Sequence, residues 1–353
     1  MTERRRIEWL DYARIVATLG ILVFHYSTAT LHGVVTSIGS LEHLLPVTAY
    51  GFVGVDLFFM VSGYVVVQAA MEQPPGRFAI GRAVRLYPAF LVCMTATAIV
   101  DQASGRDITW GQYLANLLLP GVFGQPGVDG VYWTLAYELK FYILVWLGLL
   151  VRRGKLLPTM VIGWAAVIGV NRLLDLDLPF SEGFFALFAG GALLARAANE
   201  RVQWPVMLAL AAMVVVSADH AYEFATTLDT AGLRYISPAI AAALVAVFYG
   251  GFFLLGMAKP KLPSAAFAGD LTYPFYLLHA HIGYTLLNWI GSPDYQGASL
   301  GLAVAIVVTF AAAVHIYVER RPRALWYRWA NAVVIIITRL LASPRKPVEQ
   351  AAE

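Results

Sequence analysis

Three ionisable residues interrupt the first long apolar run of the sequence, residues 10–31: Asp11, Arg14 and His25. In an α-helix, Arg14 and His25 lie on one face, because their spacing leaves only about 20° between them and about 16 Å of rise. Asp11 lies one turn from Arg14 and is its expected counterion. A histidine in this place can act as a general base or as a nucleophile. An interhelical hydrogen bond of the histidine and a helix-anchoring ion pair are the structural alternatives.

Further candidates lie in the next two apolar runs. Asp56 interrupts residues 50–71, and because a charge within a membrane span costs several kcal/mol, it is a functional candidate. Arg82 and Arg85 lie on adjacent turns at the start of residues 83–103. Two arginines at this spacing can hold a phosphate through charge-assisted hydrogen bonds. Anchoring at the cytoplasmic membrane surface is the alternative role of this pair.

Two later runs carry an acid and two histidines. Glu138 precedes Lys140 by two residues, a spacing that points side chains to different faces of a helix. We therefore expect Glu138 to pair with an arginine or histidine of another helix, or with a substrate hydroxyl. His279 and His281 diverge in the same way. A metal site formed by these two histidines is therefore not expected, and no other group has the spacing of metal ligands.

Membrane-spanning helices are needed to position these residues, because the composition excludes an ordinary soluble protein. Of the 353 residues, 59% are hydrophobic and 13% are charged, against about 25% charged in soluble domains. The mean hydropathy is +0.67. The net charge of +3 comes from basic residues in short clusters, which argues against a nucleic-acid partner. The single cysteine, Cys93, cannot form an intrachain disulfide.

Apolar runs long enough to cross a bilayer recur along the whole chain and predict an all-α, polytopic integral membrane protein. The ten predicted spans are residues 10–31, 50–71, 83–103, 132–151, 156–171, 182–198, 204–218, 236–257, 271–291 and 299–318. If the N-terminus is cytoplasmic, twenty of the 25 Lys and Arg residues fall in inner segments and three in outer loops. Positive residues favour cytoplasmic loops, so the sequence predicts that both termini are cytoplasmic.

One further apolar segment, residues 324–342, follows the last span. Arg328 and Arg339 leave only a short uncharged stretch within it. We expect it to lie on the cytoplasmic membrane surface, anchored by Trp326 and Trp329. The predicted organisation is therefore a transmembrane domain, residues 1–323, followed by an interfacial helix and polar tail, residues 324–353.

Five motifs, in order and on the predicted helices, resemble those of the acyltransferase family 3 membrane proteins. They are Leu10-Asp11-Tyr12-Ala13-Arg14 with His25, Gly54-Val55-Asp56-Leu57-Phe58-Phe59 with Ser62-Gly63-Tyr64, Arg82-x-x-Arg85-Leu86-Tyr87-Pro88, Trp133-Thr134-Leu135 with Glu138, and Tyr273-Pro274-Phe275-Tyr276-Leu277-Leu278-His279. The resemblance covers nearly the whole chain. It implies a multi-pass enzyme of the bacterial cytoplasmic membrane.

The activity implied by this resemblance is O-acylation, in which a cytoplasmic acyl-CoA, commonly acetyl-CoA, donates its acyl group to a hydroxyl of an envelope glycan, an exopolysaccharide or a similar acceptor. By similarity, His25 and Arg14 are the essential pair of the first helix, and Arg82 and Arg85 are the cytoplasmic pair of the third. Glu138 is expected to orient the acceptor or His25. His25 is expected to serve as general base, with a covalent acyl-histidine as the alternative.

No metal is implied, and a homo-oligomer is left open. Some family members carry a fused SGNH hydrolase-like domain that completes the transfer outside. For this chain two routes stay open: it acylates its acceptor directly, or a separate protein completes the transfer.

A transporter or flippase is the rival hypothesis, with His25, Glu138, Asp56 and Arg14 forming an intramembrane pathway. Against it, the sequence shows no pair of broken helices in corresponding positions of two halves, the usual indication of inverted repeats. A non-catalytic membrane scaffold is the third hypothesis, and the intact arginines and His25 argue against it.

Overall fold

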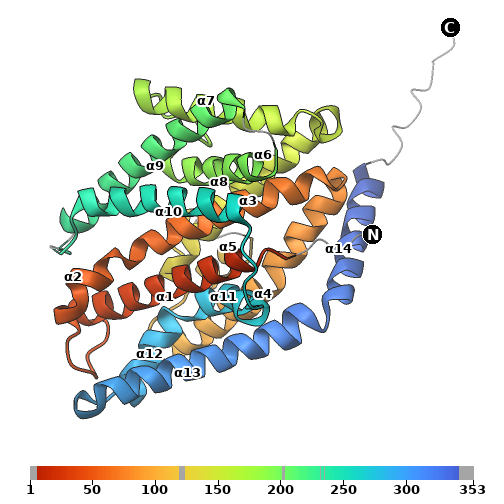
Figure 1. The fold of residues 1–353 in the computed structure, drawn as a ribbon. Helices are drawn as coiled ribbons and strands as arrows, with labels where there is room; N and C mark the ends of the chain where they lie inside the picture. Colours follow the sequence, from red (N-terminus) through yellow and green to blue (C-terminus); the bar gives the residue numbers. More distant parts are fainter. Residues whose placement is uncertain (1–5, 119–123, 201–202, 231, 234, 342–353) are drawn as a thin grey trace, which may run out of the picture.

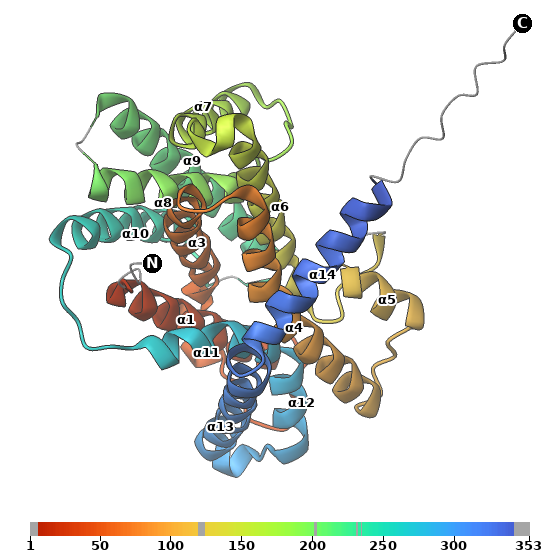
Figure 2. The ribbon, with the colours of Figure 1, turned by 90° about the vertical axis from the view of Figure 1, so that its right-hand side faces the viewer.

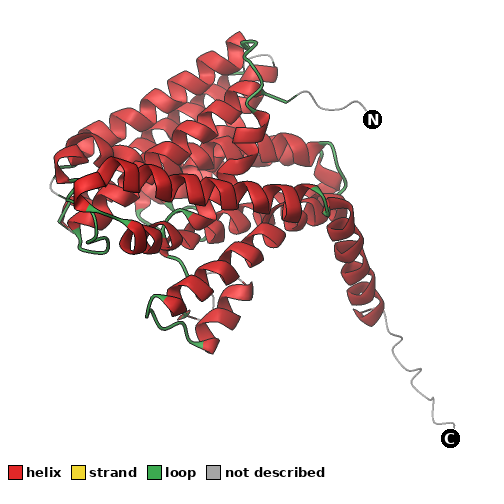
Figure 3. Ribbon diagram, turned by 90° about the horizontal axis from the view of Figure 1, so that it is seen from below, coloured by secondary structure: helices red, strands yellow, loops and turns green. Residues whose placement is uncertain are grey.

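The computed structural model describes residues 6–118, 124–200, 203–230, 232–233 and 235–341, and within these ranges every regular element is helical (Figure 3). The α-helices are α1 (Glu8–Leu31), α2 (Leu45–Thr48), α3 (Gly54–Met71), α4 (Pro75–Ala103), α5 (Trp110–Leu118), α6 (Trp133–Leu150), α7 (Leu157–Leu174), α8 (Gly183–Asn199), α9 (Trp204–Thr230), α10 (Pro238–Ala258), α11 (Ala266–Leu278), α12 (His281–Ile290), α13 (Gln296–Val314) and α14 (Arg323–Leu341). Short turns lengthen several of them: η1 (Glu42–Leu44), η2 (Ala49–Val53), η4 (Gly130–Tyr132), η5 (Val151–Gly154), η6 (Pro293–Tyr295) and the π-helical η7 (His315–Arg320). The all-α prediction is confirmed.

Eight helical segments of the described chain are long and apolar enough to cross a membrane. They are Glu8–Leu31, Glu42–Met71, Pro75–Ala103, Gly130–Leu150, Leu157–Leu174, Trp204–Thr230, Pro238–Ala258 and Pro293–Arg320. Each coincides with one of the ten predicted spans, which confirms a polytopic membrane protein.

The other two predicted spans take different forms. The sixth is α8, whose 17 residues measure about 25 Å, less than a bilayer core. Almost all of α8 is buried among α3, α7, α9 and α10, so it is enclosed by protein. The prediction of one helix over residues 271–291 is wrong, because the chain breaks after α11 and restarts as α12. Asp129 explains this break, since its carboxylate accepts the backbone N–H of His281 at 3.1 Å and so satisfies the start of α12.

Glycines allow α3 and α8 to pack closely at the centre of the bundle. A β-carbon on Gly63 would overlap the backbone of Phe188, and one on Gly191 would overlap the carbonyl oxygen of Met60. Figure 2 looks along the bundle and shows α3, α8 and α10 on one side of α1, with α11, α12 and α13 on the other. The first helix therefore lies between two groups of helices and contacts both α3 and α11.

The last helix, α14, leaves the bundle at an angle after Pro322 (Figure 1). It exposes Leu325, Trp329 and Val333, while Trp326 donates a hydrogen bond to the carbonyl of Val318 at 2.7 Å. A helix therefore occupies most of residues 324–342. Its placement on a membrane surface stays a prediction, and residues 342–353 of the predicted tail lie outside the described residues.

Candidate active site

Arginines from α1 and the residues just before it, from α4, from η7 and from the start of α14 line a cavity at one end of the bundle, which we call the basic cavity. Its volume is about 1010 Å³. Its charged lining residues are Arg6, Arg14, Arg82, Arg85, Arg320, Arg323, Asp11, Asp270 and Glu319. Six cations against three acids leave three positive charges in excess when His315 is neutral. Such a cavity attracts anions.

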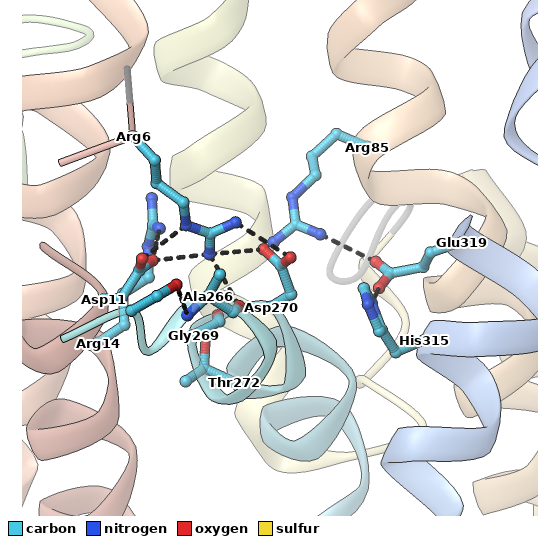
Figure 4. Close-up of polar contacts among 11 residues, drawn as sticks. Arg6, Asp11, Arg14, Arg85, Ala266, Gly269, Asp270, Thr272, His315 and Glu319 are labelled. Atoms are coloured by element: carbon cyan, nitrogen blue, oxygen red, sulfur yellow. Dashed lines mark hydrogen bonds and ion pairs between the residues drawn. The ribbon is translucent and has the colours of Figure 1, made fainter. Parts of the chain in front are cut away.

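Asp11 joins two of these arginines, as Figure 4 shows. Arg14 donates from Nη1 to Oδ1 of the buried Asp11 at 3.1 Å, so the pairing predicted from their spacing is present. Arg6, which no spacing pattern singles out, is the closer partner, donating from Nε and Nη2 to Asp11 at 2.6 and 2.8 Å. Arg6 also binds Asp270 of α11 at 2.9 Å. The hydrogen bond to Asp11 raises the pKa of Arg6 above its usual value, so this side chain stays charged.

Arg82 and Arg85 both reach the basic cavity, but their partners differ. Arg85 donates from Nη1 to Glu319 at 2.9 Å, and Glu319 in turn contacts Nδ1 of His315 at 2.8 Å (Figure 4). The Arg85 guanidinium also lies over the Tyr273 ring at 5.1 Å. The Arg82 guanidinium lies over the rings of Phe78 and Tyr142, and its buried Nε has no hydrogen-bond partner among the described residues. Arg82 is therefore free to take an added acceptor.

A second, narrower cavity continues from the basic cavity, and we call it the inner chamber. Its volume is about 130 Å³, and it shares Arg14, Val65, Arg82 and Arg85 with the basic cavity. Its other lining residues are Val55, Phe58, Phe59, Val61, Ser62, Val66, Thr134, Leu135, Glu138, Tyr142, Thr272, Tyr273 and Tyr276. The Oγ of Ser62 is buried without a partner among the described residues. Narrow, largely apolar walls with a few polar groups suit a slender chain rather than a bulky ring.

Glu138 lies in the inner chamber and accepts a hydrogen bond from the hydroxyl of Tyr142, one turn along α6. Lys140 points elsewhere, toward Glu182 at 4.0 Å. The two side chains therefore diverge, as their spacing predicts, but the partner of Glu138 is a tyrosine of its own helix rather than an arginine or histidine of another. Among the described residues, no hydrogen bond joins Glu138 to His25, so its orienting role stays a prediction.

His25 lines neither the basic cavity nor the inner chamber. Its ring centre lies 5.1 Å from that of His279, at the end of α11, and the His279 ring lies 5.4 Å from that of Tyr276. Tyr276 lines the inner chamber. On the shared face of α1, Arg14 therefore borders both cavities. His25 is separated from them by two ring contacts, His25–His279 and His279–Tyr276.

The family model of acyltransferase 3, described as an acyltransferase domain, matches residues 7–318. The chain belongs to this family. The match covers α1 through most of η7, and therefore includes Arg14, His25, Arg82, Arg85 and His279. The prediction of an O-acetyltransferase-like enzyme is confirmed at this level.

Curated relatives of this acyltransferase carry related names. BcsY of Komagataeibacter xylinus, whose name describes a membrane-bound transacylase, is 26% identical in an alignment 312 positions long that covers 76% of each chain. The exopolysaccharide production protein ExoZ of Rhizobium meliloti is 26% identical over 73% of this chain and 66% of its own. The O-acetyltransferase OatA of Staphylococcus aureus is 22% identical over 82% of this chain, but the match spans about half of OatA, 51%. No solved structure matches this chain.

Three other predicted candidates of the acyltransferase lie away from the basic cavity and the inner chamber. Asp56 is buried in α3 and lines neither of them. Tyr64 packs against Trp9 and lines a third cavity of about 600 Å³, which shares Arg6, Ile7 and Gln68 with the basic cavity. Trp133 packs its ring against Phe184 at the start of α6. Their roles stay predictions.

The break between α11 and α12 sends the two histidines of the acyltransferase in different directions. His279 faces His25, whereas Nδ1 of His281 lies 2.8 Å from the buried Asp101 and close to Arg106. Asp129 holds the break itself. Within the described residues, no group of three or more His, Cys, Asp and Glu side chains has the arrangement of a metal site.

Proposed function

We propose that this chain transfers an acyl group, most simply acetyl, from acyl-CoA to a hydroxyl of an envelope glycan or exopolysaccharide. The donor enters the basic cavity, which we place on the cytoplasmic side because Lys and Arg residues concentrate there in the sequence. The acceptor class is supported by the names of two relatives, an exopolysaccharide production protein and an O-acetyltransferase. A bacterial cytoplasmic membrane follows from the same proposal.

The observation that carries the proposal is the pair of joined cavities. CoA combines a cluster of phosphates with a long, thin pantetheine arm that ends in the thioester. The basic cavity offers an excess of arginine over acid, and phosphates form strong charge-assisted hydrogen bonds with guanidinium groups. The inner chamber continues from Arg82 and Arg85 as a narrow space with the unpartnered Ser62 Oγ on its wall. A phosphate site at the mouth and a narrow channel behind it match the two parts of the donor.

His25 is the proposed general base. It takes the proton of the acceptor hydroxyl while the oxygen bonds to the acyl carbon and the carbon–sulfur bond breaks, and it then gives the proton to the thiolate to form CoA–SH. Tyr276 lies between the chamber and the histidines, held by hydrogen bonds to Thr134 at 2.9 Å and to the carbonyl of Val131 at 3.0 Å. The proposal therefore includes a movement of the Tyr276 side chain that brings thioester and His25 together.

The test is acyl transfer by the purified full-length chain in lipid nanodiscs, with radiolabelled acetyl-CoA and an oligosaccharide acceptor. General acid–base groups contribute about 10²- to 10⁴-fold, so we expect His25→Ala to lower turnover by that factor while donor binding persists. His32→Ala, an exposed histidine just beyond the same helix, is the matched control and should behave as the unaltered chain. Full turnover by His25→Ala would overturn the role of His25. Uptake of an oligosaccharide into sealed vesicles without acetyl-CoA would instead support the transporter hypothesis.

A further inference from the structure

The ring of His279 has one nitrogen bound and one free. Its Nδ1 lies 2.7 Å from the carbonyl oxygen of Tyr276, a contact that requires the proton to be on Nδ1. Nε2 of the neutral ring is then an acceptor. The side chain is 1% exposed, and Nε2 has no hydrogen-bond partner among the described residues. Because a buried acceptor without a partner costs free energy, such an atom in a native site calls for a functional explanation.

The His25 ring lies where it can supply that partner. The centres of the two rings are 5.1 Å apart, and their planes are tilted by 60°. Two imidazoles joined by an N–H···N bond of about 3 Å have centres about 5 Å apart, because each nitrogen lies roughly 1 Å from the centre of its ring. The separation of the two rings therefore fits such a bond. Catalytic hydrogen bonds are often misaligned before substrate binds.

We propose that His279 is a positioning residue for His25: its Nε2 accepts a hydrogen bond from one N–H of His25 and so leaves the other nitrogen free as the base. The inference rests on the proposed function, in which His25 takes the acceptor's proton. The bond fixes the tautomer of His25 before the reaction. It then stabilises the imidazolium that forms when the proton arrives, since that ring carries an N–H on both nitrogens. The proton itself stays on His25 until it passes to the thiolate.

The local fold supports this role over simple packing. His279 is the residue at which α11 ends, and the break that follows frees the chain from helical geometry there. His281, two residues later, instead contacts Asp101 and Arg106 through its Nδ1. Asp129 caps α12, and among the described residues no acid is hydrogen-bonded to the His279 ring. Nε2 of His279 is therefore available to an N–H of His25.

Two substitutions separate the two nitrogens. Glutamine places an oxygen acceptor where Nε2 stands but has no donor at the Nδ1 position. Asparagine places an N–H donor where Nδ1 stands, but its shorter side chain places no acceptor at the position of Nε2. If His279 acts through Nε2, we expect His279→Gln to keep kcat within about 10-fold of the unaltered chain. His279→Asn should lose about 100-fold, the upper range for losing a group that orients a functional histidine.

The measurements are kcat and KM for acetyl transfer and the dissociation constant of acetyl-CoA, all in nanodiscs. We expect kcat to change and the donor dissociation constant to stay the same in both variants. His220→Gln and His220→Asn are the controls, because His220 also has a buried, unpartnered Nε2 but lines neither the basic cavity nor the inner chamber. The glutamine and asparagine variants of His220 should have similar kcat values.

The reverse order, with asparagine as active as the unaltered chain and glutamine inactive, would overturn the inference and assign His279 to the Tyr276 contact alone. Equal losses in both variants, with weaker donor binding, would mean that His279 supports the fold and would also overturn it. Failure of the proposed function has a different signature: His25→Ala would then turn over normally, whatever the His279 variants do.

Discussion

The two ends of the α1–α11 pair differ in charge, in the cavity they border and in hydrogen bonding. At one end, Asp11 lies against Gly269, and arginines surround a cavity of about 1010 Å³. At the other end, about 20 Å along α1 from Asp11, His25 lies against His279, whose buried Nε2 has no hydrogen-bond partner among the described residues. The first end has charge and space, and it suits binding. The second has an unpartnered imidazole and lines neither of the two cavities, and it suits chemistry that begins only when substrate arrives.

This difference teaches that binding and catalysis can be altered separately, although one pair of helices carries both. The helices are parallel, because Asp11 pairs in space with Gly269 and His25 with the later residue His279. A change at the basic end should therefore alter donor affinity, and a change at the histidine end should alter turnover.

The largest effect expected at the basic end is that of Arg85→Ala. A hydrogen bond to a charged group contributes about 1.5–3 kcal/mol, so we expect acetyl-CoA affinity to fall about 10- to 150-fold. Turnover at saturating donor should change little, and acceptor KM should stay the same. Isothermal titration and steady-state kinetics in nanodiscs measure the two quantities.

Arg321→Ala is the control for Arg85→Ala. Arg321 also stacks on a tyrosine, with its guanidinium 4.6 Å from the Tyr317 ring, but it lines neither the basic cavity nor the inner chamber. It should bind acetyl-CoA as tightly as the unaltered chain. Equal losses in the two variants would show that total positive charge, and not the basic cavity, attracts the donor.

A smaller effect is expected where α1 and α11 meet. A β-carbon on Gly269 would lie 2.8 Å from Cβ and Cγ of Asp11 and closer still to its Oδ1, so Gly269→Ala forces the helices apart. Overpacking of this kind costs about 1–3 kcal/mol, and we expect a lower melting temperature in detergent. Donor affinity should fall as well, because Arg6 and Arg14 are held through Asp11.

Gly301→Ala is the matched control for this substitution, since it also lies within a helix but has open space around it. Its melting temperature should stay the same or rise slightly, because alanine favours a helix over glycine. If Gly269→Ala and Gly301→Ala had the same melting temperature, the close contact at the basic end would contribute nothing to stability.

The spacing of residues within single helices could be interpreted from the sequence, and pairs between distant helices could not. The Asp11–Arg14 pair follows from helical periodicity. Arg6 and Asp270 are 264 residues apart, and no local pattern connects them. The break after α11 cannot be predicted from the local sequence for the same reason. Asp129, which caps α12 and so stabilises the break, comes from another part of the chain.

Hydropathy predicts ten spans but does not show which helices are enclosed by protein. The 17 residues of α8 look like any other apolar run in sequence, yet the helix lies inside the bundle. Likewise, one face of α1 carries both Arg14 and His25, but cavity shape depends on the neighbouring helices. The ring of Tyr276, from α11, separates the inner chamber from His25.

The smallest effect is expected at the break near the histidine end, from Asp129→Asn. The two oxygens of Asp129 accept different backbone N–H groups, those of Val131 and His281, each at 3.1 Å. An amide keeps only one of these acceptors and removes the negative charge at the start of α12. Loss of a helix cap costs about 0.5–2 kcal/mol, so we expect a modest fall in melting temperature.

If the separation between the two ends holds, Asp129→Asn lowers kcat severalfold, because the end of α11 no longer holds His279 firmly, and it leaves acetyl-CoA affinity unchanged. Asp294→Asn, an exposed acid before α13, is the control and should change neither quantity. A fall in donor affinity as large as that of Arg85→Ala would contradict the separation, since it would mean that the break and the basic cavity move as one unit.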